Sequence, residues 1–166
     1  FMAGHGIQSK GSYFFMAYGS NLNRPALESI SEEELKKELL YNIDSKKSVV
    51  MLDTCQSGFV PGRRGSGPNM DRLIENLSEA EGMIFLSASR SNQAAQERPE
   101  WGHGAFTLAM KEALGEGMAK DRNGDGAIDV GELYDYVGDR VFDLTNGEQK
   151  PNMSGSIEFF PLYGIE

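Results

Sequence analysis

His5 and Cys55 are the two residues whose types and positions fit nucleophilic catalysis. His5 lies near the end of the strand-like stretch FMAGHG at 1–6, and Cys55 follows the apolar run SVVML at 48–52. A thiol becomes an effective nucleophile beside a base, and an imidazole titrates near neutral pH. The sequence therefore predicts a catalytic dyad in which Cys55 is the nucleophile and His5 its general base. The alternative is a buried, inert thiol together with a structural histidine.

Backbone N–H groups beside the dyad are the second requirement of this chemistry, because a tetrahedral oxyanion needs hydrogen-bond donors. We expect the N–H groups of Gly6 and Cys55 to form this oxyanion hole. Gly4 and Gly6 flank His5, and glycine lets the backbone come close to a substrate.

Asp53 and Glu97 are candidates for binding the substrate side chain. Residues two apart on a strand point to the same face, so Asp53 and Cys55 should face one cleft. A carboxylate there suits an Arg or Lys before the scissile bond. Glu97 follows the next apolar run and is predicted to be a second acidic wall. The alternatives are a carboxylate that caps a turn for Asp53 and a solvated loop charge for Glu97.

The stretch 121–132 has the spacing of a twelve-residue calcium loop. The predicted ligands are the side chains of Asp121, Asn123, Asp125, Asp129 and Glu132 and the backbone carbonyl of Ala127. Gly126 stands where the loop needs its sharp turn. The sequence therefore predicts a Ca²⁺ cofactor in an EF-hand-like loop. The alternative is an Asx-rich turn that caps a helix without an ion.

Residues 58–68 (GFVPGRRGSGP) combine glycines and prolines with Arg63 and Arg64. This composition predicts an exposed loop, and proteolytic nicking concentrates in exposed loops. An enzyme that prefers arginine could cut itself there, so we predict a processing site at Arg63 or Arg64. An ordinary basic surface loop is the alternative.

Alternating strand-like and helix-like segments must position these residues. Strands are predicted at 13–18, 48–52, 82–88 and 157–162, and helices at 32–41, 70–80 and 104–115. This alternation favours an α/β sandwich with a mainly parallel sheet. Ligands bind at the carboxyl ends of strands in such sheets, where His5 and Cys55 would lie. His103 follows a polar loop and precedes a helix, so we expect it to have a surface or helix-capping role.

The bulk composition narrows the classes of protein and partner. The chain has 166 residues, the size of one domain, and a formal net charge of -9. Nucleic-acid binding relies on clustered Lys and Arg, so no nucleic-acid partner is expected. No run approaches the roughly 20 apolar residues of a membrane span, so no membrane partner is expected either. A lone cysteine forms no internal disulfide, and 1–6 lacks the features of a secretion signal. We therefore expect a cytoplasmic protein.

Four stretches together carry a resemblance to a known family: FMAGHG at 1–6, LDTCQSG at 52–58, GHGAFT at 102–107 and ELYDY at 132–136. They resemble the caspase-like cysteine peptidases, especially the bacterial and metacaspase or paracaspase branch. The resemblance implies one caspase-like three-layer sandwich over 1–166, in which the loop at 121–132 is embedded, and it implies the same catalytic pair. It also implies strands and a helix upstream of the histidine strand. We therefore expect an N-terminal segment or a second chain to complete the fold.

The sequence thus predicts a cysteine endopeptidase whose substrates are proteins or peptides with Arg or Lys before the scissile bond. Asp53 before the nucleophile looks like the metacaspase and paracaspase pattern, whereas Asp-specific animal caspases use a different residue there. One alternative keeps the enzyme and makes it Asp-specific, which the charge of Asp53 opposes. Another is a catalytically silent, calcium-binding regulatory or scaffold module with the same fold.

Overall fold

The computed structural model describes residues 1–9, 12–21, 23–43, 45–55, 82–90, 93, 95–155 and 158–165. Two predicted segments lie outside the described residues: the helix at 70–80 and the loop at 58–68, which contains Arg63 and Arg64. No helix in the described part of the chain is both long and apolar enough to cross a membrane.

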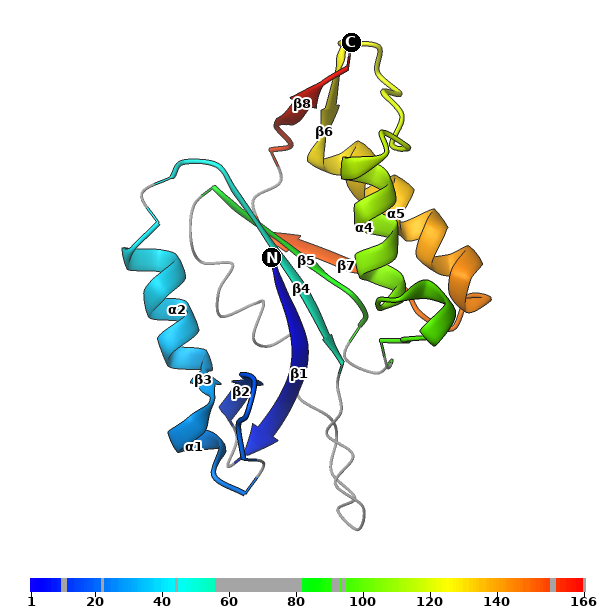
Figure 1. Cartoon of the computed structure of the whole chain (residues 1–166). Coiled ribbons are helices and arrows are strands. Elements are labelled where there is room, and N and C mark those ends of the chain that lie inside the picture. Colours follow the sequence, from blue (N-terminus) through cyan, green and yellow to red (C-terminus); the bar gives the residue numbers. More distant parts are fainter. Residues whose placement is uncertain are drawn as a thin grey trace.

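A six-stranded sheet forms the centre of the described structure, in the order β3-β2-β1-β4-β5-β7. Its strands are β1 Met2–Ser9, β2 Ser12–Met16, β3 Ile30–Ser31, β4 Ser48–Cys55, β5 Met83–Ser87 and β7 Asn152–Gly155. β1, β4 and β5 are parallel, whereas β2, β3 and β7 join antiparallel. The predicted α/β class is confirmed. The sheet is mixed, with the predicted parallel arrangement in its central strands (Figure 1).

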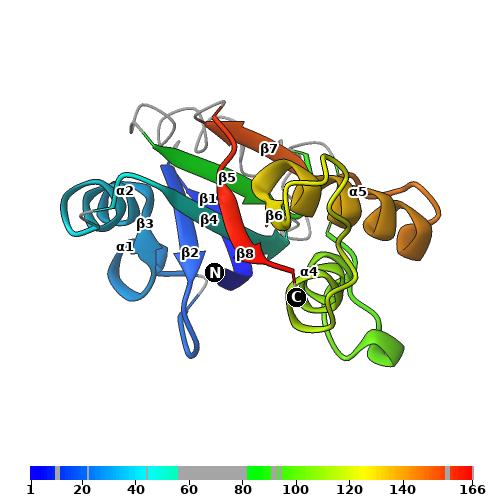
Figure 2. The same ribbon diagram turned by 90° about the horizontal axis from the view of Figure 1, so that it is seen from above.

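Helices cover both faces of this sheet and give the molecule three layers (Figure 2). α1 Pro25–Glu28 and α2 Glu32–Tyr41 lie on one side, and α4 Ala105–Gly115 and α5 Val130–Thr145 lie on the other. α2 begins at a capping box, because Ser31 Oγ accepts from the Glu34 N–H and the Glu34 carboxylate accepts from the Ser31 N–H. The helices predicted at 32–41 and 104–115 are confirmed.

Alternation along β4 divides its side chains between two hydrophobic cores. Val50 and Leu52 pack with Leu35 of α2, whereas Met51 packs against the cluster that α4 and α5 form. Successive residues of a strand point to opposite faces, so Asp53 belongs to the face of α4 and α5. β5 is buried along its whole length, as expected of a strand covered on both sides. The packing of β4 between the two cores thus determines which helices a side chain at its end can contact.

The end of the chain differs from the predicted strand at 157–162. Residues 158–160 form no strand, and β8 Pro161–Gly164 instead pairs with β6 Ala127–Asp129 in a separate two-stranded sheet. Phe160 is buried in the larger core, and an apolar run does not distinguish such a packed coil from a strand. β6 belongs to the EF-hand-like loop, so the C-terminal strand lies against that loop.

Candidate active site

The backbone register places His5 opposite Cys55. β1 and β4 are neighbouring parallel strands, and their paired residues run from Met2 with Leu52 to His5 with Cys55. Neighbouring strands lie about 4.8 Å apart, so the two predicted catalytic residues are adjacent in the sheet. They stand at the carboxyl end of this ladder, the edge at which α/β sheets bind ligands.

β1 changes its partner strand at His5. The strand pairs with β4 from Met2 to His5 and with β2 from His5 to Ser9. β4 ends at Cys55, whereas β1 continues to Ser9 beside β2 (Figure 1). The ladder therefore ends at the predicted dyad. The His5 side chain is exposed there, and exposure is compatible with the predicted role of a general base.

Gly6, next to His5, has no space for a side chain. A β-carbon at this position would lie 2.2 Å from the Tyr13 hydroxyl oxygen, so a larger residue would displace the tyrosine or the strand. Tyr13 is buried, and burial raises its pKa to about 12, so its hydroxyl keeps its proton at neutral pH. This packing constrains the backbone beside His5. The oxyanion hole at the N–H groups of Gly6 and Cys55 stays a prediction.

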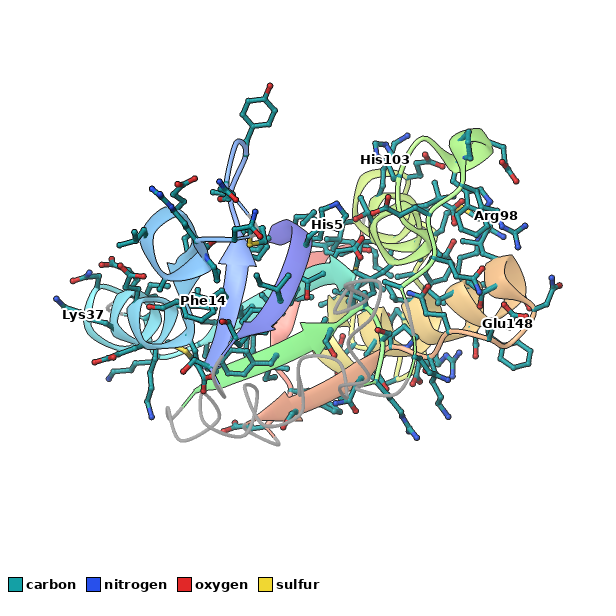
Figure 3. All side chains as sticks on the ribbon, turned by 90° about the horizontal axis from the view of Figure 1, so that it is seen from below. His5, Phe14, Lys37, Arg98, His103 and Glu148 are labelled. Atoms are coloured by element: carbon teal, nitrogen blue, oxygen red, sulfur yellow. The ribbon has the colours of Figure 1, made fainter. Side chains whose placement is uncertain are left out.

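A cleft of about 660 Å³ lies beside the start of β1 and the end of β4. It is lined by Ala3, Gly4, Asp53, Glu97, Arg98, Pro99, Gly102, His103, Gly104 and Thr107. Figure 3 looks at this end of the sheet, with His5 on β1 and His103 beside α4. The structure therefore brings the two predicted substrate-binding carboxylates, Asp53 and Glu97, to one cleft.

Asp53 is a buried carboxylate of this cleft, 8% exposed. Its Oδ2 accepts hydrogen bonds from the Thr107 backbone N–H at 3.2 Å and from the Thr107 hydroxyl. Burial raises the pKa of Asp53 above its usual value; the Thr107 hydrogen bonds oppose this rise, and the charge of Glu97 adds to it. The net direction is upward, so Asp53 gives up its proton less readily than an exposed aspartate does.

Thr107 is the residue of this cleft that sequence patterns do not reveal directly. It lies in the first turn of α4, whose N-cap Gly104 provides no side-chain acceptor. Asp53 supplies that acceptor from the neighbouring strand, and a carboxylate at a helix N-terminus also suits the helix dipole. One sequence signal could have pointed to this contact: α4 begins without a capping side chain of its own. The N–H groups of its first turn must therefore find acceptors elsewhere in the protein.

Glu97 lies on the cleft wall that precedes α4. Glu97 and Gly104 form an antiparallel bridge, and the Ala105 N–H donates to the Gln96 carbonyl at 2.9 Å. A β-carbon at Gly104 would lie 2.9 Å from Asp53 Oδ2, so glycine allows this wall to approach Asp53. The Glu97 side chain is exposed, and these contacts hold its backbone. Its role as an acidic pocket wall stays a prediction.

Two basic side chains also border the cleft. The Arg98 guanidinium lies 4.7 Å from the centroid of the Trp101 ring and 4.0 Å from the Glu100 carboxylate. His103 is exposed and precedes α4. The expected surface position of His103 is thus found, whereas the N-cap of the helix is Gly104.

The first half of the EF-hand-like loop is organised around Asp121. Its carboxylate accepts from the backbone N–H groups of Gly124, Asp125 and Gly126. These hydrogen bonds lower the pKa of Asp121, that from Gly126 most. Gly126 has a φ of 85°, a left-handed conformation that glycine adopts without steric cost. The loop thus turns sharply at Gly126, and its calcium binding stays a prediction.

The second half of this loop ends at Glu132, which lies in the first turn of α5. Asp129 and Glu132 form a capping box, and the Glu132 carboxylate also accepts from the N–H groups of Arg122 and Asn123. The oxygen donors are of the type that calcium prefers. In this arrangement these oxygens accept hydrogen bonds from the backbone N–H groups of the loop itself. Within the described residues, no three His, Cys, Asp or Glu side chains converge to hold a metal.

Comparison with known proteins identifies the family. The family model described as Caspase domain matches residues 1–160, which include the dyad and the whole cleft. No curated protein matches the chain significantly. The metacaspase or paracaspase branch stays a prediction. With its three-layer α/β fold and its match over residues 1–160, the chain belongs to the caspase domain family of cysteine peptidases.

Proposed function

We propose that this caspase-family peptidase cleaves after Arg or Lys, with Cys55 as nucleophile and His5 as general base. One observation carries the proposal. His5 and Cys55 are paired in the ladder, and the nearby strand residues Gly4 and Asp53 line the adjoining cleft. A peptide held at the dyad would therefore place the side chain before its scissile bond in a cleft with two carboxylates.

The proposed chemistry is acyl transfer in two steps. His5 takes the proton of the Cys55 thiol, and the sulfur attacks the scissile carbonyl carbon to give a tetrahedral oxyanion. The N–H groups of Gly6 and Cys55 would stabilise this oxyanion. As the C–N bond breaks, the His5 imidazolium gives its proton to the leaving amine, and a thioester remains. Water, deprotonated by His5, then attacks the thioester carbon and releases the acid, while the thiol regains its proton.

The charges of the cleft support a cationic substrate side chain. The pKa of Asp53 is raised by burial and by the nearby charge of Glu97. An Arg or Lys side chain would offset this repulsion and favour the ionised form of Asp53. An Asp side chain would instead add a negative charge, at a cost on the order of several kcal/mol when desolvated. The Asp-specific alternative is therefore disfavoured.

Matched fluorogenic peptides test this proposal. Peptides that end in Arg or Lys should be cut at least about 100-fold faster, by kcat/KM, than the same peptides ending in Asp. Cys55→Ala should abolish all cleavage and leave the circular dichroism spectrum unchanged. Cleavage by Cys55→Ala at the parental rate would exclude the assigned nucleophile. Comparable rates on Arg and Asp peptides would exclude only the basic preference.

The EF-hand-like loop supports a second proposal, that the protein binds Ca²⁺. The favouring observation is the turn around Asp121 with the left-handed Gly126. The side chains of Asp121, Asn123, Asp125, Asp129 and Glu132 and the carbonyl of Ala127 would hold the ion. A catalytically silent calcium-binding scaffold would combine this loop with an inert thiol. Rapid reaction of Cys55 with a peptidyl electrophile would exclude that alternative, because only an activated thiolate reacts fast.

A further inference from the structure

Gln149 is a buried amide that binds both ends of one connection. It lies beyond the end of α5 and is 0% exposed. Its Oε1 accepts from the Gln96 backbone N–H at 2.7 Å, and its Nε2 donates to the Ala88 carbonyl at 2.8 Å. The segment 88–96, which leads from β5 to the cleft wall, is therefore held at both ends by one side chain.

The anchor of this amide is the last turn of α5. The Gln149 backbone N–H donates to Thr145 Oγ1 at 3.1 Å, and the Thr145 hydroxyl donates to the Val141 carbonyl at 2.7 Å. Thr145 and Val141 are both 0% exposed. Gln149 is thus fixed to a helix that packs in the larger core, and through Gln149 this helix holds Ala88 and Gln96.

Gln96, at the end of this connection, is hydrogen-bonded to the start of α4 beside the cleft. The Gln96 N–H binds Gln149, and the Gln96 carbonyl accepts from the Ala105 N–H at the start of α4. The next residue, Glu97, bridges to Gly104 and lines the cleft. Gln96 Nε2 also donates to Glu148 Oε2 at 2.7 Å. Figure 3 shows Glu148, Arg98 and His103 on the same side of the sheet.

We propose that Gln149 is a positioning residue, which sets the acidic wall at Glu97 relative to Asp53 and so sharpens selection of a basic side chain. The proposal rests on the proposed function, because it concerns how that cleft selects Arg or Lys. Gln149 acts through the backbone of Gln96. An amide suits this task, since it offers one acceptor and one donor at the same time. Losing the bond to Ala88 leaves a buried C=O unsatisfied, and losing the bond to Gln96 leaves a half-buried N–H unsatisfied.

Gln149→Met in the full chain tests the proposal, because Met keeps the length and volume of the side chain and removes both hydrogen bonds. The KM for an Arg peptide should rise about tenfold while kcat changes less than about twofold. The preference for Arg over Ala at this position should fall by a similar factor. Hydrogen exchange at the Gln96 amide should become about tenfold faster.

Two variants complete the design. Val141→Ala makes a cavity in the same helix but removes no hydrogen bond to 88–96, so it should destabilise the protein and leave KM and the Arg preference unchanged. Gln149→Glu keeps an acceptor for the Gln96 N–H, so exchange at Gln96 should stay close to wild type, with KM raised only about threefold. If Gln149→Met does not fold, the KM of Gln149→Glu decides.

The outcomes separate this proposal from the proposed function. Unchanged KM and Arg preference in the folded Gln149 variants, or equal losses in Val141→Ala, would overturn the positioning role. A wild-type protein that does not cleave Arg peptides would instead refute the function. Hydrogen exchange at the Gln96 amide then tests by itself whether Gln149 holds the Gln96 backbone. Faster exchange in Gln149→Met than in Val141→Ala supports this role, and equal exchange overturns it.

Discussion

At the scale of single residues, the contact between Asp53 and Thr107 links the fold to the proposed substrate selection. Thr107 engages Oδ2 of Asp53 through its backbone N–H and its hydroxyl, which ties β4 to the start of α4. The same carboxylate lines the cleft, so its other oxygen can meet a cationic substrate. Asp53 therefore serves as a helix cap, close to the alternative considered for it, and also fits the proposed binding role.

Thr107→Val should move the acidic limb of activity on Arg peptides to higher pH. The hydroxyl hydrogen bond lowers the pKa of Asp53, so its loss raises that pKa further, and a protonated Asp53 does not attract a cation. The dependence of kcat/KM on pH should be measured with an Arg peptide and with an uncharged analogue, because only the Arg peptide needs the charge of Asp53. A shift of equal size with the two peptides would contradict the assignment of Asp53.

Asp53 also makes folding stability depend on pH. Its pKa is raised in the folded protein, so this group's stabilisation is complete below the unfolded pKa and is lost as pH rises through the folded pKa. Asp53→Asn keeps an oxygen acceptor for Thr107 and cannot ionise. Wild type should therefore lose stability relative to Asp53→Asn as the pH rises. The melting temperature of Asp53→Asn minus that of wild type should increase between about pH 4 and pH 8. A difference that is constant across this range would show that Asp53 does not titrate as stated.

Sequence patterns found the residues at strand ends and missed those defined by tertiary contacts. His5, Cys55 and Asp53 each follow a recognisable apolar run, so their meeting at one sheet edge could be predicted. Thr107 binds a residue 54 positions away, and Gln149 binds one 53 positions away. No local pattern reports such partners, because they exist only after the sheet and helices have packed.

At the scale of elements, periodicity predicted segments better than it predicted their partners. α2, α4, β4 and β5 lie where apolar spacing and runs indicated. β2 lies where a strand was predicted at 13–18, but its antiparallel pairing was not predicted. The strands β3 and β7 and the pairing of β8 with β6 could not be predicted either. The partner of a strand depends on which apolar faces meet in the folded chain, and a single segment does not contain that information.

The loop before α5 gives the prediction that belongs to this scale. Calorimetry near neutral pH should show one Ca²⁺ site, and the melting temperature should rise with its occupancy. Glu132→Gln should weaken binding at least about tenfold, because it removes the anionic bidentate ligand while keeping an acceptor for the capping box. Asp139→Asn is the matched control, since Asp139 lies on the same helix, 3.7 Å from Arg122, and is no predicted ligand. Absent heats with an unchanged melting temperature would leave only the hydrogen-bonded turn.

At the scale of the whole molecule, β1 offers a place for the predicted N-terminal segment or second chain. Residues 2–5 pair with β4, and residues 5–9 pair with β2 on the opposite edge. The edge of residues 2–4 that faces away from β4 has no ladder partner within the described residues. A strand added there would lie next to Ala3 and Gly4 of the cleft, so completing the sheet would also shape the substrate site. This partner stays a prediction.

Self-processing is the prediction that needs the whole enzyme. Arg63 and Arg64 lie outside the described residues, but their charge matches the proposed selectivity of the cleft. Incubated active protein should therefore be cut after Arg63 or Arg64, with one water consumed per bond, because one molecule can bind this segment of another as a substrate. Fragment masses over time provide the measurement. The rate should rise with protein concentration if the cut occurs between molecules.

Three samples decide this prediction: the active protein, its Cys55→Ala form, and a variant with Arg63→Gln and Arg64→Gln that keeps the dyad. Only the first should give the fragments. Cuts in the Cys55→Ala sample would point to a contaminating protease. The double variant separates processing from catalysis: if it cleaves Arg peptides as fast as the cut protein does, the nick is a by-product of the enzyme's selectivity. If its activity is low and is restored by cutting with an added protease at a newly introduced site in 58–68, the cut is the activating step.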